Sequence, residues 1–224
     1  MALTCTASIS EIRSVCERVT ATWRYRFVKR LIDLWLSLLA LVLLSPLLLL
    51  IAFLIKLSSP GRVLYSWRIV DQTGKPFTSY KFRTMVENAE GMEEALRAAG
   101  RNEMKGIYFK IRRDPRVTPL GATLRQFSLD ELPTLFSVMT GNLSMVGPRP
   151  VRVHEFEKLS EWEKSRLMAK PGLTGLWQIS GKNQISDFGD IVTMDIEYIE
   201  KWSLALDLII LLKTVPCVIA GRNY

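Results

Sequence analysis

The longest apolar run of the chain extends from residue 31 to residue 57, LIDLWLSLLALVLLSPLLLLIAFLIKL, with Pro46 near its middle. As one straight helix it would be about 40 Å long at 1.5 Å per residue, more than the ~30 Å hydrocarbon core of a bilayer requires. Proline removes a backbone donor and collides with the preceding turn, and the hydroxyl of Ser45 can satisfy a carbonyl freed there. The run therefore predicts a membrane segment, either one tilted span or two helices that meet at Ser45-Pro46.

Basic residues flank this apolar run at both ends. They are Arg24, Arg26, Lys29, Arg30, Lys56, Arg62 and Arg68. Because basic flanks tend to stay in the cytoplasm, a true span would place one flank on the wrong side of the membrane. A helix-break-helix keeps both flanks inside, and its halves of about 14 and 11 residues would each reach only about 16–21 Å. Asp33 fits near the boundary, where Lys29 or Arg30 can pair with it at helical spacing.

After the membrane segment the pattern changes to shorter elements. Residues 61–85 alternate, are rich in Val, Tyr, Phe and Thr, and contain a turn at 73–76, which predicts a β-hairpin. Helices are expected at 86–99, 120–127, 133–141, 152–169 and 187–202. The final apolar piece is interrupted by Asp207, Lys213 and Pro216, and we expect a helix that lies in the membrane interface.

These elements predict a compact, mainly helical α/β domain on the cytoplasmic leaflet, with a re-entrant membrane helix and interfacial amphipathic helices. Residues 1–23 contain Glu11 and Glu17 and lack a compact apolar core, so they predict an amphipathic or loosely ordered extension, not a secretory signal. The expected division of the chain is an N-terminal extension at 1–25, the membrane segment at 26–58, a cytoplasmic domain at 59–202 and a C-terminal membrane-interface segment at 203–224.

Charge and cysteine content narrow the partners. The chain carries 30 Lys and Arg against 22 Asp and Glu, a net charge of +8, which favours acidic lipids, nucleotide phosphates or nucleic acid. Nucleic-acid binding rests on net charge alone, and the basic flanks suit membrane docking better, so no nucleic-acid partner is expected. Three cysteines without metal-ligand spacing predict no disulfide framework and a reducing compartment. The single histidine, His154, cannot build a His-rich metal site.

The stretch SLDELPTLFSVMTGNLSMVGPRP, residues 128–150, contains the strongest candidate chemistry. Ser128 and Glu131 fit the S-x-x-E pattern of a capping box, which would make the acidic pair structural. If Pro133 occupies the first helical position instead, Asp130 and Glu131 lie exposed in the turn before the helix. A carboxylate can attack phosphorus, and a neighbouring carboxylate can hold Mg²⁺.

Basic side chains near this pair are candidates for phosphate contacts. Arg125 lies five residues before the pair, and Arg149 sits between two prolines in a Gly-Pro-Arg-Pro turn. Guanidinium groups recognise phosphate oxygens in a fork. Lys81 and Arg83, in the sequence YKFRTM, are two further basic candidates. The alternatives are a solvated loop arginine for Arg149 and plain strand-edge charge for Lys81 and Arg83.

Several collinear motifs closely resemble the bacterial sugar transferases. The motif L-R-x-x-S-L-D-E-L-P matches at 124–133, P-R-P at 148–150, and a glycine-rich loop, PGLTGLWQISGK, at 171–182. By itself such a loop lets a backbone approach a ligand, or it simply turns. The resemblance covers roughly residues 26–216 and departs from the family after the membrane helix, where residues 61–67 read GRVLYSW.

These enzymes are monotopic phosphoglycosyl transferases that move a sugar-1-phosphate from a nucleotide sugar onto a polyprenol phosphate. The resemblance implies that Asp130 is the phosphorylated nucleophile and that Glu131, with Asp130, is the Mg²⁺ ligand. It implies substrate contacts for Lys81, Arg83, Arg125, Arg149, Gln178 and Lys182. Two further positions in the sequence DIEY, Asp195 and Tyr198, also match the family.

The implied partners are a UDP-sugar, undecaprenyl phosphate and the bacterial inner membrane, with residues 59–202 as the catalytic domain on its cytoplasmic face. The implied form is the small, catalytic-domain-only one, at the first membrane step of polysaccharide or glycoconjugate assembly. A second copy could pair through the N-terminal extension as a homodimer. Two alternatives stay open at this point. One is direct transfer in a ternary complex, with Asp130 as base or Mg²⁺ ligand. The other is a membrane-anchored scaffold without catalysis.

Overall fold

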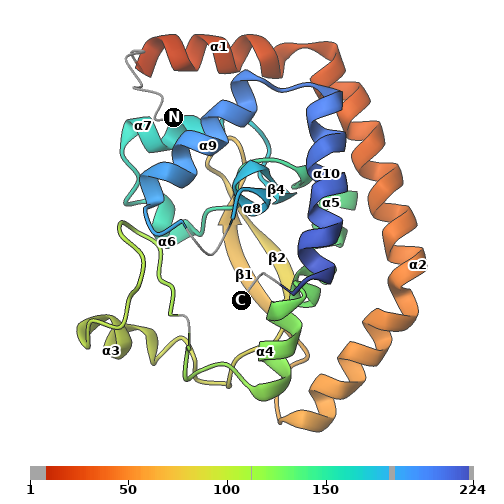
Figure 1. Ribbon diagram of the computed structural model, residues 1–224, viewed down its shortest axis with the longest axis vertical. Helices are drawn as coiled ribbons and strands as arrows, with labels where there is room; N and C mark the ends of the chain where they lie inside the picture. Colours follow the sequence, from red (N-terminus) through yellow and green to blue (C-terminus); the bar gives the residue numbers. More distant parts are fainter. Residues whose placement is uncertain (1–8, 112, 182–184, 222–224) are drawn as a thin grey trace.

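The computed structural model describes residues 9–111, 113–181 and 185–221. Helices predominate, and two small sheets lie among them (Figure 1). The strands are β1 (Leu64–Val70) antiparallel to β2 (Pro76–Phe82), and β3 (Ser144–Val146) parallel to β4 (Gly172–Thr174). The prediction of a mainly helical α/β domain is confirmed.

The predicted membrane segment is one helix, α2 (Lys29–Ser58), which follows a π-helical segment at Arg24–Val28. It is long and apolar enough to cross a membrane, and 17% of its most apolar window is buried against the rest of the chain. The helix is continuous through Pro46, and in Figure 1 it changes direction along its length and curves around the domain. A proline is an ordinary cause of such a bend. The expected break is therefore a bend, and re-entry into the membrane stays a prediction.

Basic side chains attach the start of α2 to the domain. Lys29 Nζ lies 2.6 Å from Asp207 Oδ2, and both side chains are almost wholly buried. Arg30 donates two hydrogen bonds of 2.6 Å to backbone carbonyls near the C-terminal end of α5 (Leu135–Thr140). A cation is favourable there because the last carbonyls of a helix carry the negative end of its dipole.

Asp33 also anchors α2, but through a partner that the helical spacing did not predict. Its Oδ1 accepts a hydrogen bond of 3.0 Å from the backbone N–H of Met145, beside β3. No salt bridge joins Asp33 to Lys29 or Arg30 in the part of the chain that the structure describes, although the Lys29 charge still acts on Asp33. Tertiary contacts occupy both cations, which bind the C-terminal region and α5 instead.

The predicted hairpin is confirmed. Its register runs from Leu64 opposite Phe82 to Val70 opposite Pro76. Asp71 begins the turn, and its Oδ1 accepts from nearby backbone N–H groups at 2.7 and 3.0 Å, as an Asx-type turn does. The buried side chains of the hairpin pack against α5, which places the end of β2 beside the acidic pair.

Three of the predicted helices are confirmed with small shifts. They are α4 (Pro119–Gln126), α9 (Phe188–Glu200) and α10 (Leu204–Ile219). Thr118 begins α4 as its N-cap, accepting from the Gly121 N–H, and proline follows at the first helical position. Along α10, Asp207 and Ile210 are buried, whereas an apolar face is exposed at Leu208, Ile209, Leu212, Val215 and Ile219.

The helix predicted at 86–99 is too long. Only α3 (Glu93–Ala98) is helical, because the chain before it is held by residues far away in sequence. Met85 forms a β-bridge with Val117, and the Val86 N–H donates to the Arg116 carbonyl at 2.9 Å. Turns then lead into α3. A helix over 86–99 would also have contained Gly91, and a glycine inside a helix is unfavourable.

The single helix predicted at 152–169 is wrong as well. The segment contains α6 (Val153–Phe156), α7 (Glu161–Lys164) and a 3-10 turn at Ser165–Met168. A capping box begins α7, in which Ser160 and Glu163 exchange side-chain and backbone hydrogen bonds. The capping box lies in the sequence SEWE, residues 160–163. Because it begins a new helix at Glu161, the preceding helix cannot continue through this position.

The main apolar core lies where the N-terminal and C-terminal elements meet. Helix α1 (Ile9–Ala21) buries Ile12 and Cys16 in this core and packs on α9 (Figure 1). The described part of the predicted N-terminal extension is therefore an amphipathic helix that belongs to the domain. A second cluster joins Ile51 and Ile55 of α2 to β2 and α4.

Candidate active site

A cavity of about 1000 Å³ opens beside the hairpin. Most side chains predicted from the sequence line it, namely Lys81, Arg83, Arg125, Asp130, Glu131 and Arg149. Gln178 lines a small adjoining pocket. Its Oε1 is buried without a hydrogen-bond partner among the described residues. Lys182 lies outside the described residues. Residues from separate motifs between positions 81 and 149 therefore converge on one cavity.

The acidic pair lies in a 3-10 helix, η2 (Leu129–Thr134). Ser128 precedes it with φ 51°, a left-handed conformation that is uncommon for a residue with a side chain. Ser128 makes no capping hydrogen bond, so the capping-box interpretation is not supported. The prediction that Pro133 begins an α-helix is wrong, since Pro133 lies inside η2 and α5 follows it. Asp130 and Glu131 are partly buried within η2 and line the cavity wall, instead of lying exposed in a turn before a helix.

Glu131 pairs with Lys81 of β2. Lys81 Nζ lies 2.6 Å from Glu131 Oε1, with 21% and 27% of the two side chains exposed. The ammonium group also lies 4.2 Å from the centre of a Trp67 ring, a cation–π distance. Thr134 donates to the Tyr80 carbonyl at 3.0 Å, which fixes η2 against β2. Lys81 is thus held at the cavity wall, where an incoming phosphate can compete with Glu131 for it.

Arg125 approaches the cavity from α4, and Arg83 approaches it from the residue that follows β2. Arg125 Nε donates to Thr84 Oγ1 at 2.9 Å, which leaves the rest of its guanidinium fork for other acceptors. Arg83 donates to the carbonyl and hydroxyl of Ser59 at 2.9 Å each, and to the Pro60 carbonyl. Arg83 is therefore more than strand-edge charge, because it ties the hairpin to the chain that leaves α2.

Arg149 is held between two aromatic rings. Its guanidinium carbon lies 4.9 Å from the centre of the Tyr108 ring and 4.8 Å from the Trp177 ring. Arginine stacks well on aromatic faces while its edge keeps hydrogen-bond donors available. A solvated loop arginine, which was the alternative, would not be held in this way.

Glycines of the predicted glycine-rich loop support the turn that carries Arg149. A Cβ atom on Gly172 would lie 2.1 Å from the Gly147 nitrogen, and a Cβ atom on Gly147 would lie 2.3 Å from the Lys170 carbonyl oxygen. The Gly172 N–H donates to the Pro148 carbonyl at 2.8 Å. Only residues without side chains allow this approach. Gly147 and Gly172 therefore allow β3 and β4 to pack closely. The sequence analysis had proposed only approach to a ligand or a simple turn for the loop.

Asp195 and Tyr198 of α9 lie behind the cavity. Asp195 forms an ion pair with Arg166, and neither side chain is exposed. Burial raises the pKa of Asp195 to about 6, although the Arg166 charge acts in the other direction. The Tyr198 hydroxyl lies 2.7 Å from Asp207 Oδ1. Tyr198 therefore belongs to the group that anchors α2, whereas Asp195 lies close to the turn that carries Arg149.

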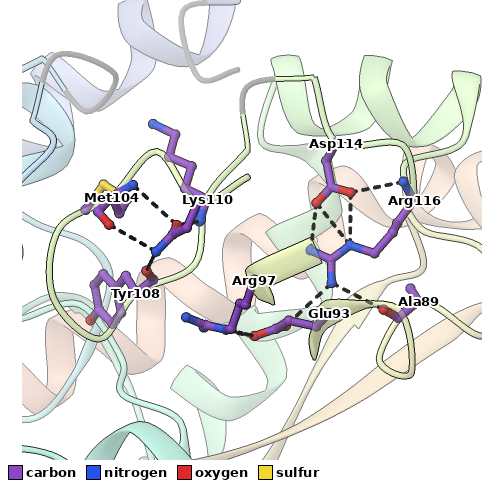
Figure 2. A network of polar contacts seen from close by, with 9 residues as sticks. Ala89, Glu93, Arg97, Met104, Tyr108, Lys110, Asp114 and Arg116 are labelled. Atoms are coloured by element: carbon purple, nitrogen blue, oxygen red, sulfur yellow. Dashed lines mark hydrogen bonds and ion pairs between the residues drawn. The ribbon is translucent and has the colours of Figure 1, made fainter. Parts of the chain in front are cut away.

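Alternating charges form the far wall of the cavity. Figure 2 shows Arg116 between Asp114 and Glu93, with Arg97 beyond Glu93. Both arginines also lie over the Phe109 ring, at 4.5 and 5.0 Å. Burial acts to raise the pKa of Asp114, but hydrogen bonds from the side chain and backbone of Arg116 outweigh it and lower that pKa. The sequence analysis did not identify this wall.

The acidic pair fits the way proteins hold Mg²⁺. Within the described ranges, no group of three or more His, Cys, Asp and Glu could hold a metal ion by itself. Mg²⁺ usually keeps waters and uses one or two carboxylates together with substrate phosphates. Adjacent carboxylates at the wall of an open cavity are such a donor set, so Asp130 and Glu131 would hold the ion with the substrate.

The family follows from a match over most of the chain. The family model for bacterial sugar transferases matches residues 24–221, and the chain belongs to this family. An exopolysaccharide production protein, ExoY, of Sinorhizobium fredii is 43% identical over 198 residues, which cover 87% of each chain. The family predicted from the motifs is thus confirmed.

Two longer relatives carry more specific names. An undecaprenyl-phosphate galactose phosphotransferase of Salmonella typhimurium is 40% identical over 197 residues, 87% of this chain and 41% of that protein. A UDP-glucose:undecaprenyl-phosphate glucose-1-phosphate transferase of Escherichia coli is 38% identical over 199 residues, 85% of this chain and 40% of that protein. The chain thus spans about two-fifths of the length of these two relatives.

Proposed function

We propose that the protein transfers a sugar-1-phosphate from a UDP-sugar to undecaprenyl phosphate and releases UMP. The observation that carries this proposal is the convergence of Asp130 and Glu131 with Lys81, Arg125 and Arg149 on one cavity. A carboxylate among fixed cations suits attack on a phosphate of a nucleotide sugar. The names of the Salmonella and Escherichia coli relatives support the acceptor and the donor class.

The proposed reaction has two steps. In the first, a carboxylate oxygen of Asp130 attacks the phosphorus that bears the sugar, and the bond from that phosphorus to the bridging oxygen breaks. UMP leaves with the bridging oxygen and its electron pair, and a phosphosugar remains on Asp130. In the second, an oxygen of undecaprenyl phosphate attacks the same phosphorus. The bond to Asp130 then breaks, and the lipid diphosphate-linked sugar leaves.

The basic residues stabilise the charge that moves during both steps. Lys81 exchanges its contact with Glu131 for a phosphate oxygen, and Glu131 is then available to a cation. Arg125 and Arg149 offer guanidinium donors to the remaining phosphate oxygens. Mg²⁺, when bound by the acidic pair, neutralises pyrophosphate charge.

Exposed apolar surfaces on α2 and α10 support a membrane location. Side chains such as Trp35, Leu43, Leu49 and Leu57 of α2 are more than 60% exposed, and α10 adds the face described above. Contiguous apolar surface of this kind is costly in water and marks membrane or protein contacts. We place the protein in the bacterial inner membrane, with a re-entrant α2 and the cavity at headgroup depth on the cytoplasmic face.

The first experiment is UMP release from a panel of UDP-sugars with Mg²⁺, detergent and undecaprenyl phosphate. The wild type is expected to release UMP from one sugar in an acceptor-dependent reaction. Asp130→Asn is expected to lower the rate about 10³-fold or more, since losing a nucleophile removes a whole pathway. Asp190→Asn, on an exposed aspartate of α9, is the matched control and should keep wild-type rates.

Kinetics separate the covalent route from direct transfer. Parallel double-reciprocal lines and a sugar-phosphate mass increase on the peptide that contains Asp130 are expected for the two-step route. Intersecting lines without an adduct would indicate direct transfer in a ternary complex. UMP release that persists in Asp130→Asn would disprove the nucleophile, and no UMP from any sugar would favour the scaffold alternative.

A further inference from the structure

A buried arginine, Arg166, connects the elements that hold Arg149. It lies in the 3-10 turn that follows α7, and its side chain is wholly buried. Its Nη2 donates to the backbone carbonyl of Arg149 at 3.0 Å, and its Nη1 donates to the Tyr108 hydroxyl at 3.0 Å. The same Nη2 contacts Asp195 Oδ2. One guanidinium group thus joins the loop of Tyr108, the turn of Arg149 and helix α9.

Tyr108 links this buried group to the side chain of Arg149. Its hydroxyl binds Arg166, and its ring forms one side of the aromatic pair around the Arg149 guanidinium. The ring also meets Phe188 edge-to-face, with centroids 4.6 Å apart. The position of the Arg149 fork therefore depends on how Arg166 holds Tyr108.

The loop that carries Tyr108 is itself braced. The Asn102 amide donates to the carbonyls of Met104 and Tyr108 at 3.0 and 2.9 Å, and it accepts from the Lys110 N–H at 2.9 Å. Figure 2 shows these contacts gathering Met104, Tyr108 and Lys110 around one side chain. Because the Asn102 side chain joins both sides of the loop, a shift of Tyr108 would move the whole loop.

A buried ion pair is weak evidence for stability, because removing both charges from water costs about as much as their attraction returns. The pair of Asp195 and Arg166 is better explained by a role in holding nearby residues in place. Asp195 and Arg166 are wholly buried, yet the contacts of Arg166 lead to the backbone and the ring neighbour of a cavity-lining arginine. Reactions that depend on fixed charge lose rate steeply when a group is misplaced.

We propose that Asp195, Arg166 and Tyr108 are positioning residues, which fix the Arg149 guanidinium for contact with a phosphate of the substrate. This inference rests on the proposed function, because it assigns Arg149 to the phosphoryl transfer. Tyr108 acts through Arg149 and needs no contact of its hydroxyl with substrate, since that hydroxyl is bonded to Arg166.

The test is a double-mutant cycle with Tyr108→Phe and Arg149→Lys, read as kcat/KM for UMP release. Tyr108→Phe keeps the ring and removes only the hydroxyl. In the wild type it is expected to lower kcat/KM about tenfold, the order that a small misplacement costs. In the Arg149→Lys background, where the fork is already lost, it is expected to change kcat/KM less than about twofold.

Thr20→Val is the matched control. It removes a hydroxyl that donates to the Cys16 carbonyl at 2.9 Å within α1, a helix that contributes no side chain to the lining of the cavity. It should lower Tm by an amount similar to Tyr108→Phe and leave kcat/KM unchanged. Asn102→Ala, which loosens the same loop without touching Arg166, provides a second cycle if Tyr108→Phe fails to fold.

The outcomes distinguish this inference from the proposed function. If Tyr108→Phe lowers kcat/KM tenfold in both backgrounds, the positioning role is overturned. It is also overturned if Tyr108→Phe leaves kcat/KM unchanged in the protein that retains Arg149. If Arg149→Lys itself keeps wild-type kcat/KM, Arg149 has no part in the transfer and the positioning role fails with it, while Asp130→Asn still tests the reaction. Absence of UMP release from the wild type overturns the proposed function.

Discussion

Two Asp–Arg pairs, one in the wall of the cavity and one buried in the protein, differ in how they are built. Asp114 and Arg116 are two residues apart, and Asp114 accepts from the Arg116 backbone N–H, Nε and Nη2 at 2.7–3.0 Å. Asp195 and Arg166 are 29 residues apart and share one contact. Asp195 Oδ1 is buried without a hydrogen-bond partner among the described residues. The first pair is a local unit, and the second joins distant elements.

The pKa shifts of the two aspartates have opposite signs. Burial opposes ionisation in both pairs. Several donors to one carboxylate outweigh burial at Asp114 and lower its pKa. At Asp195 the contacts with Arg166 and Arg149 do not outweigh it, because the side chain is wholly buried, and burial raises the pKa to about 6. The comparison teaches that the depth of burial, more than the presence of an arginine, decides whether a carboxylate is favoured as an anion, since Asp114 lines the cavity and Asp195 lies wholly inside the protein.

The largest expected effect is on stability when an arginine is removed. Arg166→Met should lower the free energy of unfolding by about 3–5 kcal/mol, because it leaves Asp195 as a buried, unpaired charge. Arg116→Met should cost less, about 1–3 kcal/mol, because Asp114 keeps the backbone donor and lines the cavity. Urea unfolding in detergent, followed by tryptophan fluorescence, measures both. Equal losses would contradict the comparison.

The next effect is a difference in pH dependence. A raised pKa means that the folded protein binds the Asp195 proton more tightly than the unfolded chain does. The contribution of Asp195 to stability is therefore present below about pH 4 and is lost as the pH rises through about 6. This shift in pKa corresponds to about 3 kcal/mol of the free energy of unfolding. Asp114, with its lowered pKa, contributes stability above its ordinary pKa and loses it as the pH falls further.

Unfolding curves between pH 3 and pH 7 test this difference. The wild type should lose stability between pH 4 and pH 6 relative to Asp195→Asn, which has no proton to release there. Relative to Asp114→Asn, the wild type should lose stability only at the acid end. Parallel curves for the wild type and Asp195→Asn would show that Asp195 is an ordinary anion in the folded protein.

A smaller effect is expected on activity. Asp195→Asn should lower kcat/KM for UMP release about tenfold through the Arg166 and Arg149 contacts, whereas Asp114→Asn should stay within about twofold. Both substitutions keep the side-chain shape and remove one charge. If Asp114→Asn were the more damaging, the alternating charges of the far wall would hold substrate, and the assignment of the two pairs would be reversed.

The smallest effect belongs to the outer end of the far wall. Arg97 pairs with Glu93 at helical i,i+4 spacing, at 2.9 Å, and its side chain is 36% exposed. Exposed pairs of this kind contribute about 0.3–0.5 kcal/mol. Arg97→Gln should therefore lower the free energy of unfolding by no more than about 0.5 kcal/mol. A loss above 1 kcal/mol, measured in the same urea series, would mean that Arg97 supports Arg116 through the Phe109 ring.

Elements with strong local signals could be predicted from the sequence. The hairpin has alternating residues and an Asp-led turn, and α4 has Thr118 and a proline at its start. The predictions failed where distant residues intervened or where a second start signal was overlooked. The bridge of Met85 to Val117 keeps the start of the predicted helix at 86–99 extended, and Ser160 begins a new helix inside 152–169.

By itself, the sequence determined the apolar helix, the family and the acidic and basic side chains of the motifs that line one part of the cavity, because helical periodicity and collinear motifs are local properties of the chain. Only the tertiary structure decided what holds them. Lys29 binds Asp207 across 178 residues, Arg83 binds the end of α2, and Arg166 supports Arg149 from a buried turn. The contribution of a buried charge to stability depends on which hydrogen-bond donors and opposite charges the fold places beside it. These partners come from distant parts of the chain, so local sequence patterns do not predict them.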